Sequence, residues 1–269
     1  MPARLGSGEG RTRHPYLHEL GRPRVLAHRG LVTAELAALG VADNSRAAVA
    51  AAVAAGADAV ETDCRVTADG EVVLFHDAGL ERVAGLRARV AETTLGELAA
   101  IMADRGGLLT LRSALEDFPG VRFNVDVKAP AAAEPTGRIV APEGHRVLLT
   151  SFSDASRARA LRAARSAGAT PVPATSPGRN RLLGILAALA SGSGALAGRA
   201  LAGLDALQIP ERSGPVPVLS GRLLAVAAGH GVEVHVWTVN DPARMRELVG
   251  RGVSGVVTDR ADVARAEMS

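Results

Sequence analysis

Three acidic residues in two β-like runs could together bind a cation. Glu61 and Asp63 lie in the run "DAVETD", and Asp126 lies in the run "VRFNVDVK". Because successive strand side chains alternate between two faces, Glu61 and Asp63 point the same way. Like charges repel one another in a shared buried site, and a hard divalent cation relieves that repulsion. Ligands made only of oxygen favour Mg²⁺ or Ca²⁺ over zinc.

Two cationic residues lie close to these acids. Lys128 is the only lysine among the 31 Lys and Arg residues, and it stands two positions after Asp126 in "NVDVK". Arg29 follows the first β-like run. Ion pairs between these cations and the acids, without any metal, account for the same residue types equally well. If both cations face an open site, a guanidinium fork and a compact ammonium suit a phosphate oxyanion.

Two histidines end β-like runs and suit acid–base chemistry. His28 ends "RVLAH" and precedes Arg29, while His76 ends "EVVLFH" and precedes Asp77. A single histidine at a strand end is more often structural, but two at one rim beside carboxylates and cations favour catalysis. One imidazole can act as general base and the other as general acid near neutral pH. The whole set indicates phosphoryl-ester chemistry.

These side chains require a scaffold that brings several strand ends to one rim. Nine β-like runs alternate with stretches long enough for helices, over residues 24–28, 58–63, 71–76, 121–128, 146–151, 170–174, 205–210, 232–238 and 254–259. The "DG" between the second and third runs predicts a hairpin, so the third strand is expected to be antiparallel. Eight parallel strands then remain, and they predict an α/β fold, a (β/α)₈ TIM barrel.

The barrel is expected to occupy residues 21–269 as one domain, after a flexible arm over 1–20. Residues 78–116, inserted after the second barrel strand and its hairpin partner, are expected to form a small cap over the site. A doubly wound sheet is the alternative, but no G-x-G-x-x-G turn follows the first run. The stretch "NSRAAVAAAVAAG" predicts a helix with Asn44 as its N-cap, and residues 179–203 predict a helix followed by a flexible lid.

Composition excludes several classes of protein. The net charge is only +3 and aromatic residues make up 2%, which disfavours a nucleic-acid partner. The single cysteine, Cys64, excludes an intramolecular disulfide, and strand alternation directs it to the helix-facing core. No long apolar stretch or signal-peptide pattern occurs, so a cytoplasmic protein without membrane insertion is expected. The oligomeric state stays open.

The motifs together resemble a known family. The series "AHRG", "DNS", "ETDCRVTADGEVVLFHD", "NVDVK", "TSF", "WTVN" and "GVVTD" is similar to that of the glycerophosphodiester phosphodiesterases, TIM-barrel enzymes that hydrolyse glycerophosphodiesters with a divalent metal. The resemblance runs from about residue 15 to the C-terminus, and its most specific part is the stretch 61–77.

The resemblance implies three groups of site residues. The acid–base pair is His28 and His76, with His28 assigned as the base. The ligands of one divalent cation, Mg²⁺ or Ca²⁺, are Glu61, Asp63 and Asp126. The substrate-binding residues are Arg29 and Lys128 on the phosphate, Trp237 in the wall of the pocket, and Asn44, which with Asp43 braces the site. The partner is then a small-molecule phosphodiester.

Two positions depart from the family pattern, which usually has Glu where this chain has Asp43 and Asp126. Each change shortens the reach of the carboxylate by about 1.5 Å, one C–C bond. Asp126 then reaches the metal through a water, or its strand lies closer to the metal. Two other functions fit the residues less well. One is a degenerate barrel that binds phosphodiesters without turnover, and the other is a Schiff-base aldolase that uses Lys128.

Overall fold

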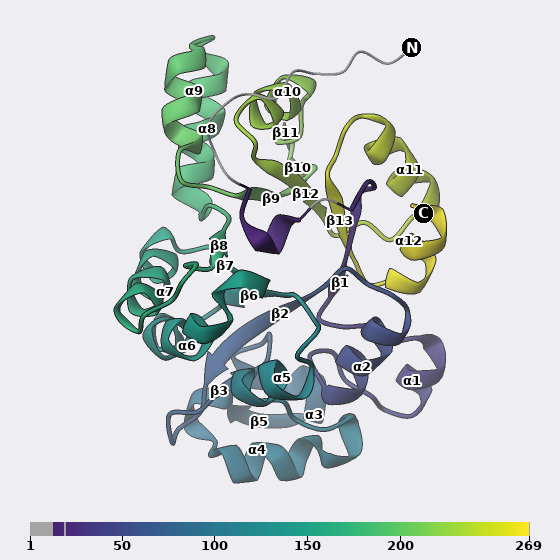
Figure 1. Ribbon diagram of the computed structural model, residues 1–269. Helices are drawn as coiled ribbons and strands as arrows, with labels where there is room; N and C mark the ends of the chain where they lie inside the picture. The colour runs from purple at the N-terminus through teal and green to yellow at the C-terminus, as the bar shows by residue number, and fades with distance from the viewer. Residues whose placement is uncertain (1–12, 19, 269) are drawn as a thin grey trace.

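The strands that carry His28 and the three acidic residues belong to one barrel (Figure 1). The computed structural model describes residues 13–18 and 20–268. Eight parallel strands pair in the order β8-β7-β6-β2-β1-β13-β12-β9, and β3 (Val72–Leu74) pairs antiparallel with β2. The barrel strands are β1 (Arg24–His28), β2 (Ala59–Val66), β6 (Phe123–Val127), β7 (Val147–Thr150), β8 (Ala174–Thr175), β9 (Ala206–Pro210), β12 (Glu233–Trp237) and β13 (Gly255–Thr258). The predicted TIM barrel and its antiparallel third strand are confirmed.

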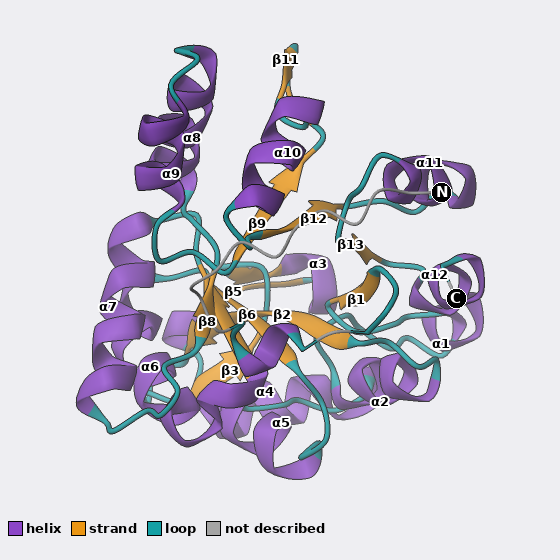
Figure 2. Ribbon diagram, turned by 45° about the horizontal axis from the view of Figure 1, so that its top comes forward, coloured by secondary structure: helices purple, strands orange, loops and turns teal. Residues whose placement is uncertain are grey.

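Helices cover the outside of this barrel (Figure 2). They are α1 (Ala34–Ala38), α2 (Arg46–Ala54), α6 (Ala133–Val140), α7 (Asp154–Ser166), α8 (Arg179–Ala190), α9 (Gly194–Leu201), α10 (Gly221–Gly229), α11 (Pro242–Gly250) and α12 (Ala261–Glu267). The strand ladder is interrupted between β8 and β9. There the Asp205 amide donates to the Thr175 carbonyl at 2.9 Å, and the Gln208 amide donates to Ser176 Oγ at 3.0 Å.

Alternation along the strands divides the apolar core into two parts. Outward-facing side chains such as Val125 and Val234 pack in the layer between barrel and helices, where Cys64 is also buried as predicted. Inward-facing side chains such as Leu26 and Leu148 form a second cluster inside the barrel. Because apolar side chains fill the middle of the barrel, the polar inward-facing residues lie near the ends of the strands.

The helix predicted with Asn44 as its N-cap begins one residue later than expected, at Arg46, and its N-cap is Ser45. The Ser45 hydroxyl accepts a hydrogen bond from the Ala48 amide at 3.2 Å. Asn44 has a φ of 57° and its side chain is hydrogen-bonded to strand β2, so it is not free to cap the helix. Both Ser and Asn are good caps, and the tertiary contact of Asn44 decides between them.

The amino-terminal end of the barrel is covered by the short 3₁₀ turn Pro15–Leu17, which lies at the centre of Figure 1. Tyr16 and Leu17 are both only 1% exposed and pack with Leu26 and Ala59 inside the barrel. The flexible arm expected over residues 1–20 therefore does not extend to this turn. Residues 1–12 of that arm lie outside the described part of the chain.

A buried ion-pair cluster lies next to this turn, where Arg24 Nη2 donates to the carbonyl of His18. Glu233 Oε2 accepts hydrogen bonds from Arg24 Nε at 2.7 Å and from His235 Nε2 at 2.9 Å, so Glu233 and His235 form a structural pair on one face of β12. Burial alone would raise the pKa of Glu233. The hydrogen bonds from His235 and Arg24 outweigh burial and bring the pKa to about 2.

We expect Glu233→Gln to lower the free energy of unfolding by about 3 kcal/mol at neutral pH, because a neutral amide no longer offsets the buried Arg24 charge. The folded pKa of about 2 lies below the unfolded value of about 4.3. The contribution of Glu233 is therefore complete above the unfolded pKa and is lost as the pH falls through about 2. Urea denaturation of the wild type and of Glu233→Gln, at neutral and at acidic pH, measures the difference in their free energies of unfolding.

Glu92→Gln is the matched control, because Glu92 pairs with Arg89 on the surface at 3.8 Å. Its expected effect is below about 0.5 kcal/mol. The role given to Glu233 would be contradicted if the two variants lost equal amounts of unfolding free energy. It would also be contradicted if the free energy of unfolding of Glu233→Gln differed from that of the wild type by as much in acid as at neutral pH.

The insertion over residues 78–116 builds a small unit beside the barrel. It contains β4 (Gly79–Leu80), α3 (Glu81–Ala84), β5 (Leu86–Arg89), α4 (Leu95–Met102) and α5 (Leu111–Asp117), and several of its side chains form a separate apolar cluster with Val73 and Phe75. Arg82 reaches the rim of the site, where it pairs with Asp43 and Asp77. No residue of the insertion lines the cavity described below, so it borders the site and does not cover it.

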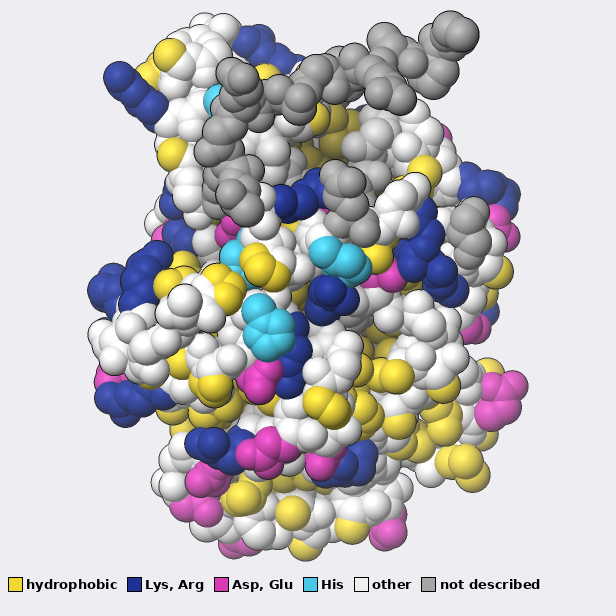
Figure 3. All heavy atoms as spheres, in the orientation of Figure 1, with side chains coloured by type: hydrophobic (Ala, Val, Ile, Leu, Met, Phe, Trp, Pro, Cys, Tyr) yellow, Lys and Arg dark blue, Asp and Glu magenta, His cyan; other side chains and the backbone are white. Residues whose placement is uncertain are grey.

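Three further expectations concern the surface charge, membrane insertion and the stretch 179–203. On the face shown in Figure 3, basic side chains are spread over several elements and lie among acidic ones. Among the described residues, no helix has the length and apolar character needed to cross a membrane. The stretch 179–203 forms two helices, α8 and α9, instead of the predicted helix followed by a flexible lid.

Candidate active site

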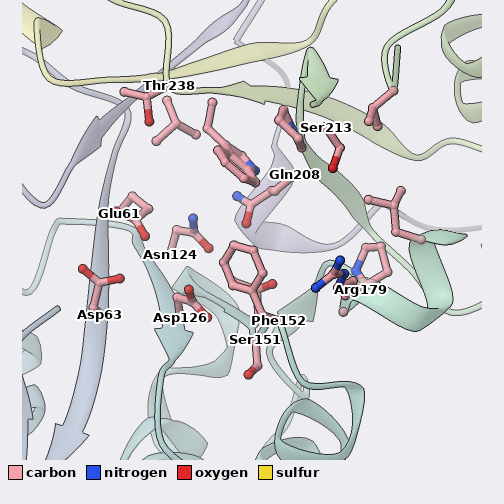
Figure 4. A pocket seen from close by; sticks show the side chains of 18 of the residues that line it. Glu61, Asp63, Asn124, Asp126, Ser151, Phe152, Arg179, Gln208, Ser213 and Thr238 are labelled. Carbon is pink, nitrogen blue, oxygen red and sulfur yellow. The ribbon is translucent and has the colours of Figure 1, made fainter. Parts of the chain in front are cut away.

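A cavity of about 610 Å³ opens at the carboxyl ends of the barrel strands. Eight of the nine predicted site residues line it: His28, Arg29, Glu61, Asp63, His76, Asp126, Lys128 and Trp237. Figure 4 shows Glu61, Asp63 and Asp126 on one side of the pocket, with Phe152 between them and Arg179 in that view. The ninth residue, Asn44, is buried behind Asp63 and does not line the cavity.

The turn after β1 explains the sequence His-Arg-Gly. Arg29 has a φ of 58°, a left-handed conformation that costs an ordinary residue roughly 1 kcal/mol or more. Its amide donates to the Glu61 carbonyl at 2.8 Å, which holds the turn against β2. At Gly30 an added Cβ would lie 2.6 Å from the Ala48 carbonyl carbon, so only glycine fits. This close approach sets Arg29 at the cavity rim.

Asn44 positions a carboxylate rather than a substrate. Its Nδ2 donates to Asp63 Oδ2 at 3.0 Å, and its Oδ1 accepts from Thr62 Oγ1 at 2.6 Å. The Asn44 amide in turn donates to the Arg29 carbonyl at 2.8 Å. Asn44 thus ties the loop after β1 to β2, and it fixes the orientation of Asp63. Its predicted place among the substrate-binding residues does not match this position.

The three acids come from neighbouring strands, as the sequence predicted. In the β2–β6 pairing, Asp63 lies opposite Asp126, and Glu61 lies one layer deeper, opposite Asn124. Burial raises the pKa of Glu61 well above its usual range, and the charges of Asp63 and Asp126 raise it further. Burial also raises the pKa of Asp126. For Asp63 the effect of burial is outweighed by Lys128, by the Asn44 hydrogen bond and by Arg29, so its pKa is lowered.

Lys128 lies between two of these acids. Its Nζ is 2.7 Å from Asp126 Oδ2 and 3.0 Å from Asp63 Oδ1. Burial alone would lower the pKa of Lys128, but the two carboxylates raise it, so the ammonium stays charged. Arg29 approaches Asp63 from the other side, with Nε 3.3 Å from Oδ2. Both cations therefore border the acidic cluster and the open cavity at the same time.

Each histidine has one ring nitrogen held by a carboxylate. His28 Nδ1 is 2.6 Å from Asp259 Oδ1, and His76 Nδ1 is 2.7 Å from Asp77 Oδ1. Such a bond fixes the ring and its tautomer, and leaves Nε2 to face the cavity. His28 Nε2 is 4.0 Å from Glu61 Oε2. This arrangement suits two groups that exchange protons with a bound molecule.

Sequence reasoning missed Asp259, which follows the last barrel strand in "GVVTD". Asn240 Nδ2 donates to Asp259 Oδ2 at 2.7 Å and so holds the carboxylate toward His28. Because β1 pairs with β13, a residue 231 positions away in the chain lies next to His28. The sequence could have indicated Asp259, because it is an acidic residue at the end of a predicted strand, as Asp63 is.

The donor atoms fit a hard divalent cation. Glu61, Asp63 and Asp126 offer only oxygen, and Asp126 Oδ1 is buried without a hydrogen-bond partner. A buried unpaired carboxylate oxygen is costly, and a cation would satisfy it. Within residues 13–18 and 20–268, no three acidic, His or Cys side chains already surround a metal position. Lys128 Nζ lies between Asp63 and Asp126 and contacts both. The residue types fit the cation, and the Lys128 ammonium offsets only part of their negative charge.

Comparisons with known proteins identify the family of the chain. Residues 28–263 match the model of the glycerophosphoryl diester phosphodiesterase family. The chain is 36% identical over 243 residues, 89% of this chain and 88% of the other, to a protein of Mycobacterium tuberculosis named probable glycerophosphodiester phosphodiesterase 2.

Solved structures show the same fold. A glycerophosphodiester phosphodiesterase from Thermotoga maritima superposes with a TM-score of 0.67 at 24% identity, over 90% of this chain and 96% of that one. An Oleispira antarctica phosphodiesterase, solved in complex with the product sn-glycerol-3-phosphate, has a TM-score of 0.67 at 21% identity, over 92% of this chain and 97% of that one. With the family match spanning most of the barrel and the cavity residues in place, the chain belongs to the glycerophosphoryl diester phosphodiesterase family.

Proposed function

We propose that this chain hydrolyses glycerophosphodiesters to an alcohol and glycerol phosphate, using one divalent cation and a histidine acid–base pair. The observation that carries the proposal is the arrangement of the two histidines. His28 and His76 each have Nδ1 held by an aspartate, and both line the cavity that contains the acidic cluster. Membership of the family supports the same reaction.

Arg29 and Lys128 bind the phosphodiester in this proposal. Both residues line the cavity. Each already pairs with a neighbouring carboxylate, and each has a positive charge that can also bind a phosphate oxygen. The Arg29 fork offers two parallel N–H groups, and the Lys128 ammonium offers a compact charge. Together they orient the phosphate and neutralise part of the charge that develops as it reacts.

His28 is the base and His76 is the acid. His28 Nε2 takes the proton of the attacking oxygen, and the Asp259 and Glu61 carboxylates stabilise the resulting imidazolium. His76 delivers a proton to the leaving alkoxide, and Asp77 holds its ring. The attacking oxygen belongs to water or to a neighbouring substrate hydroxyl, which gives a cyclic phosphate first.

Glu61, Asp63 and Asp126 would hold the cation, Mg²⁺ or Ca²⁺. When bound, it acts as a Lewis acid on the phosphoryl oxygens and lowers the charge of the reacting group. Two observations support a cation at this position. Asp126 Oδ1 is buried without a hydrogen-bond partner, and burial together with the neighbouring acids raises the pKa of Glu61.

Hydrolysis of a small panel of glycerophosphodiesters, with EDTA and with metal added back, tests the proposal. At least one member should be hydrolysed, EDTA should lower the rate at least about tenfold, and Mg²⁺ or Ca²⁺ should restore it. Activity that EDTA does not change would sink the metal assignment. Tight binding of a phosphodiester without turnover would favour the degenerate barrel. Borohydride trapping of Lys128 on a carbonyl substrate would favour the aldolase.

A further inference from the structure

Each histidine of the site is held by an aspartate, and each aspartate has a further partner. Behind His28 that partner is Asn240, which follows β12. Behind His76 it is Arg82, whose Nε lies 2.5 Å from Asp77 Oδ2, while Asp77 Oδ1 lies 2.7 Å from His76 Nδ1. Arg82 belongs to α3, so the inserted unit supplies the last member of this chain of contacts.

The His76 ring depends on hydrogen bonds for its position, because burial does not fix it. The side chains of His76 and Asp77 are 31% and 29% exposed. In the described part of the chain, the His76 ring bonds to Asp77, and the Asp77 carboxylate bonds to His76 and Arg82. Burial alone would raise the pKa of Asp77, but the hydrogen bonds from His76 and Arg82 lower it, so the carboxylate stays charged. Without Arg82, the Asp77 carboxylate can turn toward water and release the ring.

Arg82 is itself fixed from two sides. Its Nη2 lies 3.1 Å from Asp43 Oδ1, and Asp43 Oδ2 accepts a hydrogen bond from Arg29 Nη1 at 3.1 Å. On the other side, Arg105 Nε donates to the Val83 carbonyl at 3.0 Å, which anchors α3 within the inserted unit. The Arg82 guanidinium therefore joins α3 to the loop after β1 at the rim of the cavity.

A role in stability alone accounts poorly for this arrangement. The Arg82 side chain is 49% exposed, and an ion pair at such a position usually contributes little to the free energy of unfolding. Arg89 on β5 is an ordinary surface arginine of the same unit, paired with Glu92 at 3.8 Å. Arg82 differs from Arg89 because it contacts the carboxylate that holds a histidine of the site.

We propose that Arg82 is a positioning residue for the general acid: it holds Asp77, so that His76 keeps Nε2 directed at the leaving oxygen. This inference rests on the function proposed above, in which the bond from phosphorus to the head-group oxygen breaks and His76 gives that oxygen its proton. The inserted unit then takes part in the reaction through Arg82, although none of its residues lines the cavity.

The test compares two substrates that differ in their leaving group. Glycerophosphoethanolamine releases an alkoxide, which needs a proton, whereas the 4-nitrophenyl ester of glycerol phosphate releases a weaker base, which leaves without one. In Arg82→Gln we expect kcat to fall about tenfold for the first substrate and less than about twofold for the second. KM should change far less than kcat, because Arg29 and Lys128 still bind the phosphate. The midpoint of urea denaturation should stay that of the wild type.

Arg89→Gln is the matched control, because it makes the same exchange in the same unit away from the rim. It should keep the wild-type kcat for both substrates. Because Arg82 acts through Asp77, adding Arg82→Gln to Asp77→Asn should lower kcat by less than about twofold further.

Equal losses of kcat on the two substrates in Arg82→Gln would overturn the positioning role and leave the phosphodiesterase intact. Full additivity of the losses in the Asp77→Asn/Arg82→Gln double variant would do the same. If the wild type hydrolysed neither substrate, the proposed function would fail, and this inference with it.

Discussion

Replacing His28 with alanine is expected to lower kcat for a glycerophosphodiester by about 10²- to 10⁴-fold, the usual effect of removing a positioned acid or base. The imidazole is held through Nδ1 by Asp259 at 2.6 Å and faces the cavity with Nε2, so the substitution removes a positioned proton acceptor. KM should change far less, because Arg29 and Lys128 still bind the phosphate. Steady-state kinetics with metal present separate the two parameters.

Two further variants make this prediction sharper. Asp259→Asn keeps the imidazole but removes the charge that holds it, so a smaller loss of about tenfold in kcat and a shifted pH profile are expected. His145→Ala, at an exposed histidine after α6, should leave kcat unchanged. Undiminished turnover in His28→Ala would falsify its assignment as the base.

The barrel was predictable because its signals are local. Period-two alternation in the run 121–128 puts Val125 and Val127 on one face and Asp126 on the other. In the structure the two valines pack in the layer toward the helices, and Asp126 lines the cavity. The hairpin at "DG" identified the one antiparallel strand next to β2. Each inference needed only the residues of one or two neighbouring strands.

What the sequence could not predict depends on contacts between distant parts of the chain. Asn44 looks like a helix cap, and only the hydrogen bonds to Thr62 and Asp63 show that its side chain is committed to β2. The pairing of His28 with Asp259 requires the barrel to close between its first and last strands. The apolar side of the cavity is equally non-local, since Leu182 and Leu183 come from α8 and Val216 comes from the segment between β9 and α10.

Lys128→Arg is expected to lower kcat/KM by about 10²-fold although the positive charge is kept. Lys128 Nζ touches one oxygen of Asp126 and one of Asp63, which leaves Asp126 Oδ1 free for a cation. A guanidinium at the same position presents parallel donors that suit a carboxylate bidentately, and would bind both oxygens of Asp126. The arginine then competes with the cation for its ligand, and the concentration of Mg²⁺ or Ca²⁺ needed for half-maximal rate should rise.

The free energy of unfolding should distinguish this effect from damage to the fold. Because the arginine still neutralises the buried acids, the free energy of unfolding of Lys128→Arg, measured by urea denaturation, should differ from that of the wild type by less than about 1 kcal/mol. Arg138→Lys, at an exposed pair with Glu134 on α6, makes the reverse exchange away from the site and should alter neither activity nor stability. If Lys128→Arg kept kcat/KM within a factor of about two, any cation at this position would serve. If Lys128→Arg instead lost activity while the metal concentration for half-maximal rate stayed the same, Lys128 would act only on the phosphate. Binding of the metal by Asp126 would then not depend on the shape of the cation at position 128.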